Sequence, residues 1–92
     1  MGYGFAPRGA TVGDIAEEVV HARTKFPSNA FLLAALMEEV GELAQAMLQK
    51  QPRERIYAEA KGVACVAIRI MEEGDSTFDA LTDEQSNGVA VE

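Results

Sequence analysis

Residues 31–50 read FLLAALMEEVGELAQAMLQK, and after a Gln51-Pro52 break residues 53–73 read RERIYAEAKGVACVAIRIMEE. Apolar residues recur in both stretches every three or four positions, which is the period of a helix that buries one face. Pro52 suits a first helical turn, and Gly74 suits a helix end. Because the break is short, we expect the two helices to pack as an antiparallel hairpin in an all-α fold.

The segments on either side of this hairpin are shorter or less regular. Residues 11–25 (TVGDIAEEVVHARTK) have apolar residues at helical spacing, which predicts a flanking N-terminal helix with Thr11 or Asp14 as its cap. Ser28 or Asn29 can then cap the first helix of the hairpin. We expect an irregular arm over residues 1–10, one domain over 11–78 with a short helix beginning near Ser76, and an acidic tail over 79–92.

Charge and length limit the classes of function. The chain has 92 residues, of which 15 are acidic and 8 basic, for a formal net charge of -7. Nucleic acid is a poor partner for such a chain, whereas an anionic nucleotide can still bind through a divalent cation. A single cysteine, Cys65, and the lack of a signal-like or membrane-spanning apolar run predict a cytoplasmic protein without a membrane partner.

Helical-wheel positions predict which residues are buried. In the first hairpin helix the predicted apolar face comprises Leu32, Leu33, Leu36, Met37, Val40, Leu43, Ala44, Met47 and Leu48. Glu39 and Glu42 lie at the edge of this face, while Glu38 and Gln45 are predicted to point to solvent. In the second helix the predicted face comprises Ile56, Ala60, Val63, Val66, Ala67, Ile70 and Met71, with Cys65 on the outer side.

A carboxylate, Glu59, falls within that second apolar face. Burying an uncompensated charge costs several kcal/mol, so something must offset the charge of Glu59. In an antiparallel hairpin Glu59 and Glu42 lie at similar distances from the turn. Glu39, Glu42 and Glu59 are therefore predicted to converge as oxygen ligands of the kind that Mg²⁺ prefers.

The run LMEEVGELAQAM, residues 36–47, resembles the first metal helix of the MazG-like, all-α nucleoside triphosphate pyrophosphohydrolases. Their pattern is ExxE followed on the next helix by ExxD. Glu39 and Glu42 match the first pair and Glu59 matches the start of the second, but Gly62 stands where the family pattern has Asp.

The resemblance implies hydrolysis of a nucleoside triphosphate to a monophosphate and pyrophosphate, an activity suited to nucleotide-pool housecleaning. It implies Mg²⁺ as cofactor, with Mn²⁺ as a substitute. Glu38 or Glu42 is the candidate catalytic base. Three cations, Lys50, Lys61 and Arg69, are candidates for contacting substrate phosphates, although an ion pair of Arg69 with Glu72 or Glu73 at the helix end would be a purely structural use.

The broad apolar faces of so small a domain predict that it associates with itself. We expect a homodimer or homotetramer whose helices form a four-helix bundle. The alternative function is a catalytically degenerate oligomerisation or regulatory protein that keeps the fold and part of the metal site. The only histidine, His21, is predicted to be exposed and, without His or Cys companions, not to form a zinc site.

Overall fold

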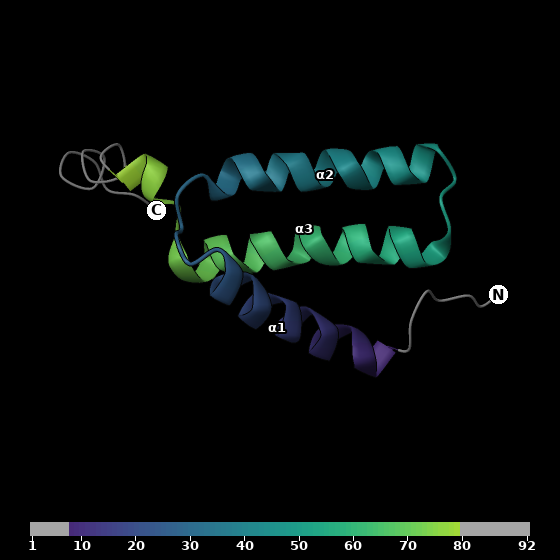
Figure 1. Cartoon of the computed structure of the whole chain (residues 1–92), viewed down its shortest axis with the longest axis horizontal. Coiled ribbons are helices and arrows are strands. Elements are labelled where there is room, and N and C mark those ends of the chain that lie inside the picture. The colour runs from purple at the N-terminus through teal and green to yellow at the C-terminus, as the bar shows by residue number, and fades with distance from the viewer. Residues whose placement is uncertain (1–7, 80–92) are drawn as a thin grey trace, which may run out of the picture.

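The computed structural model describes residues 8–79, and this part of the chain is helical throughout, without a strand. Its elements are α1 (Arg8–Lys25), α2 (Leu32–Leu48), α3 (Arg53–Glu73) and a short 3₁₀ turn, η1 (Ser76–Phe78). Helices α2 and α3 form the expected antiparallel hairpin, and α1 packs on another side of α3 (Figure 1). The central helix is α3, since α1 and α2 each contact it and not one another. No described helix is long and apolar enough to cross a membrane.

The helix boundaries agree with the sequence signals at the hairpin and differ at the N-terminus. Helix α3 ends where expected, with Gly74 at φ 71° and its N–H bonded to the Ile70 carbonyl. Helix α1 begins at Arg8, before the expected start at Thr11, so residues 8–10 are helical and do not belong to an irregular arm. Residues 1–7 and 80–92, which include the rest of the arm and nearly all of the acidic tail, lie outside the described residues.

The N-terminus of α2 is capped from a distant part of the chain. The sequence suggested Ser28 or Asn29 as the cap, but neither side chain accepts a hydrogen bond from the first N–H groups of α2. The carboxylate of Asp75 accepts the Leu33 N–H at 2.7 Å and the Phe31 N–H at 3.1 Å. The hydrogen bond from the Leu33 N–H is the largest cause that lowers the pKa of Asp75, and the bond from Phe31 acts in the same direction. The segment after α3 therefore closes the open end of the hairpin.

A buried arginine, Arg69, connects several elements at the same end of the molecule. Arg69 donates to both carboxylate oxygens of Glu73, at 2.8 and 2.9 Å, and to the Ser28 carbonyl at 3.2 Å. Arg23 of α1 also bonds Glu73. The predicted helix-end ion pair of Arg69 is thus confirmed, with Glu73 as its partner, and it connects α1, α3 and the α1–α2 connection.

The buried face of α2 overlaps only in part with the face that the sequence favours. Leu32 and Ala46 are buried there, with Leu43 and Glu39 half-buried. Six of the residues predicted to be buried are exposed on another side of α2, which we call the outer stripe: Leu33, Met37, Val40, Ala44, Met47 and Leu48. On α3 the predictions for Met71 and Ala60 are also wrong, since both are exposed. Leu36, another member of the predicted face, is half-buried, so the prediction for Leu32, Leu36 and Leu43 is right.

Candidate metal centre and adjoining cavities

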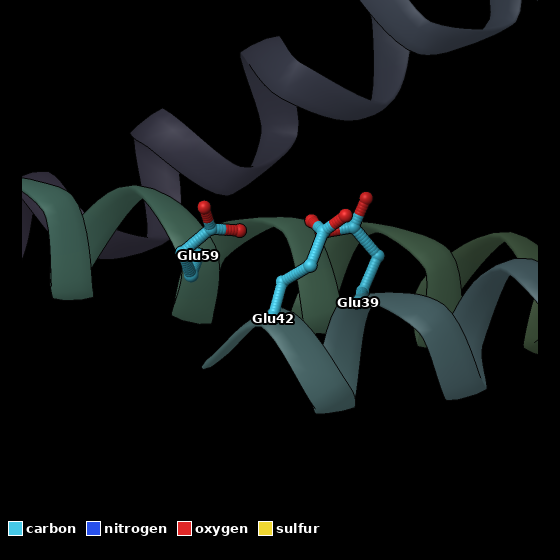
Figure 2. A group of neighbouring side chains, drawn as sticks. All are labelled: Glu39, Glu42 and Glu59. Atoms are coloured by element: carbon cyan, nitrogen blue, oxygen red, sulfur yellow. The ribbon is translucent and has the colours of Figure 1, made fainter. Parts of the chain in front are cut away.

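Three carboxylates meet between α2 and α3. Glu39 and Glu42 lie one turn apart on α2, and Glu59 comes from α3; each offers an oxygen, and these three oxygens lie within 4.8 Å of one another. In Figure 2 all three side chains point to the same side of the hairpin. The predicted convergence of these residues is confirmed. Three oxygens this close are able to hold a metal ion, and carboxylates are the ligands that hard divalent cations prefer.

Gly62 lies directly beneath Glu39. A Cβ added to Gly62 would lie 3.1 Å from Glu39 Cδ and closer than 3.0 Å to its Oε1. Position 62, where the family pattern has Asp, therefore faces the carboxylate cluster. In this chain the missing side chain makes the room that the Glu39 carboxylate occupies over the α3 backbone.

The cluster is electrostatically uneven. The pKa of Glu39 is raised, first by burial and then by the negative charges of Glu42 and Glu59. Glu59 has a cation of its own, because Arg55 Nε lies 2.8 Å from its carboxylate, one helical turn away. The side chain of Arg55 is 63% exposed, against 12% for Glu59. Arg55 is the compensating group that Glu59 requires. This pairing was not predicted from the sequence, although the i,i+4 spacing of Arg55 and Glu59 indicates it.

A polar cavity of about 400 Å³ adjoins the cluster toward the α2–α3 turn. Glu42 and Arg55 line it, together with the side chains of Gln45, Ala46, Gln49 and Gln51. Gln45 is exposed, as predicted, and its side chain borders this open cavity. The guanidinium of Arg55 and the three glutamine amides provide hydrogen-bond donors beside a potential metal ligand, Glu42.

A second cavity of about 460 Å³, which we call the three-helix groove, adjoins the cluster on the other side. Its floor is α3 and its walls are α1, α2 and the connection between them. The prediction for Cys65 is wrong: this residue is buried in the floor and not on the outer side of α3. Glu38 is exposed, as predicted, and lies at the edge of the groove. Burial raises the pKa of the Cys65 thiol, which opposes a role as nucleophile.

The candidate phosphate-binding cations lie in different settings. Lys50 is exposed just after α2, and Lys61 lies 5.8 Å from the centre of the Tyr57 ring and lines a surface hollow facing α1. Arg69 is only 4% exposed and is held by Glu73 and Ser28, so its charge is already used within the fold. His21 is exposed on α1, as predicted.

Glu39 belongs to both the cluster and the groove, and Glu42 to both the cluster and the polar cavity. The carboxylates therefore separate a polar, donor-rich space from a more apolar one. No protein-family model, no curated protein and no solved structure matches this chain, so its function must be inferred from its own side chains.

Proposed function

We propose that the chain is a Mg²⁺-dependent nucleoside triphosphate pyrophosphohydrolase, which cleaves a triphosphate to a monophosphate and pyrophosphate. One observation carries this proposal: carboxylate oxygens of Glu39, Glu42 and Glu59, from two different helices, lie within 4.8 Å of one another. The resemblance of residues 36–47 to the MazG-like enzymes supports the same activity. Nucleotide-pool housecleaning is the role that such an activity would serve.

The donor set fits the proposed cofactor. All three candidate ligands are hard oxygens, as Mg²⁺ prefers. Burial first, and then the charges of Glu42 and Glu59, raise the pKa of Glu39, and a cation placed among these carboxylates would offset both effects. Mn²⁺ accepts the same ligands and would substitute. When bound, the cation would neutralise phosphate charge and lower the pKa of a water molecule.

The protein's own residues would hold the proton and the phosphates. Glu42, at the border of the polar cavity, and Glu38, in the groove, are the proposed alternatives for accepting a proton from the attacking water. Arg55 joins Lys50 and Lys61 as a proposed phosphate contact, because its exposed guanidinium lies between Glu59 and the polar cavity. Arg69 is not proposed as a phosphate contact, because its guanidinium already donates hydrogen bonds to Glu73 and to the Ser28 carbonyl.

The outer stripe supports the proposal that the chain assembles with itself. Its residues follow spacings of four and three along α2, the pattern of helices that pack in bundles, yet Met37 is 62% exposed and Val40 42% exposed. A second copy of α2–α3 packed against this stripe would form a four-helix bundle in a homodimer or homotetramer. The carboxylates lie on a different face of α2, so this contact would leave them open.

A non-catalytic helical assembly or regulatory protein is the second candidate. Two specific observations favour it. Gly62 contributes no carboxylate to the cluster, and Arg55 already balances Glu59 without a metal ion. The two candidates predict different results with nucleotides.

The deciding experiment measures pyrophosphate release from canonical and modified nucleoside triphosphates with Mg²⁺. We expect release by the wild-type chain and none by Glu59→Gln, which removes a ligand charge while preserving shape and helical content. The matched control is Glu54→Gln, an exposed position on the same helix that lies outside the carboxylate cluster. Wild-type rates in Glu59→Gln would refute the assigned role. No release from any triphosphate, with a melting temperature that Mg²⁺ and nucleotide leave unchanged, would favour the second candidate.

A further inference from the structure

The three-helix groove combines apolar walls with acceptor groups at its edge. Alanine and valine side chains, Ala22, Ala35 and Val66, come from three different helices, and Cys65 closes the floor. Its volume of about 460 Å³ falls in the range of small-molecule pockets. The space is therefore shaped for a compact and largely apolar group.

Charge in the groove excludes phosphate. Glu18, Glu38 and Glu39 are its acidic groups, and both Glu18 and Glu38 act on Glu39 through their charge. The one cation that lines it within residues 8–79 is Arg69, whose guanidinium is bonded to Glu73 and Ser28. A phosphate placed here would meet three carboxylates, and the one cationic side chain among the lining residues is already paired. The opposite holds in the polar cavity, where Arg55 and glutamine amides face the space.

Two exposed aromatic side chains line the mouth of the groove. Phe26 and Phe31 line it and are 62% and 67% exposed. Phe31 has a left-handed backbone, with φ 62°, a conformation that is costly for a residue with a side chain. Hydrogen bonds from its N–H to Asp75 and Thr77 keep it there. Exposed rings beside an apolar slot are suited to stack on a flat aromatic ligand.

We propose that the three-helix groove binds the base of the nucleotide, with an exocyclic amino group of that base directed at Glu18. The assignment of the phosphates to the opposite side of the carboxylates rests on the proposed function. Glu18 is half-buried on α1, and its carboxylate can only accept hydrogen bonds. Cytosine and adenine offer an amino group at the position where uracil and hypoxanthine carry a carbonyl oxygen, which a carboxylate repels.

The test uses nucleosides, which carry no phosphate and require no metal. Methyl resonances of alanine and valine in the full chain are followed by NMR during titration with cytidine or uridine, and with adenosine or inosine. We expect cytidine and adenosine to shift the resonances of Ala22, Ala35 and Val66. Each should bind about tenfold more tightly than its carbonyl counterpart, since hydrogen bonds to a charged acceptor contribute about this much.

Two variants locate the binding and its selectivity. Ala35→Leu fills the groove and should abolish the shifts, whereas Ala34→Leu, the neighbouring exposed position outside the groove, should not. Glu18→Gln keeps the shape but adds a donor, so it should remove the preference for the amino-bearing member of each pair. Circular dichroism checks that each variant keeps its helical content.

The outcomes separate this inference from the proposed activity. No groove shifts with any nucleoside, or equal shifts in Ala35→Leu and the wild type, would overturn the groove as base site even if pyrophosphate is released. A groove filled by a second copy of the chain would give the same negative result. Uridine binding as tightly as cytidine would overturn the role of Glu18. Selective groove binding without pyrophosphate release would leave the groove assigned and refute the hydrolase.

Discussion

Gly62→Ala is expected to change stability and metal affinity in opposite directions. Gly62 lies in the interior of α3, where replacing glycine with alanine stabilises a helix by about 1 kcal/mol. The atom that the new Cβ would meet is the far end of the Glu39 side chain, which can rotate away at little cost. For a chain of 92 residues, 1 kcal/mol corresponds to a rise in melting temperature of about 4–8 °C.

The same rotation removes Glu39 from its place above α3. One of the three converging carboxylates is then displaced, and we expect Mg²⁺ to bind at least about tenfold more weakly, a loss of about 1.4 kcal/mol in binding free energy. Thermal unfolding by circular dichroism gives the first quantity without metal. Isothermal titration with Mg²⁺, and with Mn²⁺ as a spectroscopic substitute, gives the second.

Gly41→Ala is the matched control. Gly41 lies in the interior of α2, and a Cβ added there meets no atom within 4 Å. It should raise the melting temperature by a similar amount and leave metal affinity unchanged. If Gly62→Ala binds Mg²⁺ as tightly as Gly41→Ala does, position 62 does not control Glu39. If Gly62→Ala lowers stability, the backbone of α3 cannot accept the side chain as argued.

Three further predictions concern stability and assembly. Arg69→Met should lower the free energy of unfolding by about 3 kcal/mol in urea titrations, because it breaks the buried ion pair of Arg69 with Glu73. The ion pair of Glu73 with Arg23 remains in this variant. The exposed Lys50→Met should have little effect, and equal losses would contradict the importance assigned to the buried pair. Arg69 and then Arg23 lower the pKa of Glu73 from 4.5 to about 2, so its share of stability is present above pH 4.5 and lost as pH falls toward about 2. Glu73→Gln should flatten this dependence in urea unfolding measured across that range, and an unchanged slope would argue against it. Met37→Glu in the outer stripe should shift the sedimentation coefficient to that of a monomer, while Ala34→Glu should not; a monomeric wild-type chain would refute the proposed assembly.

The sequence determined the hairpin and the cluster because both follow from local information. The helical period of residues 31–50 and 53–73 and the break at Pro52 define two helices joined by a short turn. Helical rise then brings Glu42 and Glu59 to the same height without any further information. The ion pair of Arg55 with Glu59 belongs to this local class as well, since it spans one turn of a single helix.

Which face of α2 packs on α3 could not be obtained from hydrophobicity alone. The sequence favours Met37 and Val40 for the core, yet Ala46 is buried and those larger residues are exposed. A helix whose apolar residues cover more than one face can bury one of these faces against its neighbour and leave another exposed. Periodicity gives the two faces but not their assignment.

Long-range contacts were decided only by the tertiary structure. Asp75 caps a helix that begins more than forty residues before it in the chain, and Arg69 bonds the Ser28 carbonyl in the α1–α2 connection. The three-helix groove likewise exists because α1 packs on α3 without touching α2, which leaves a space between them. Spacing along a chain encodes what lies one or two turns away, whereas caps, buried ion pairs and cavities depend on how whole helices are placed in three dimensions.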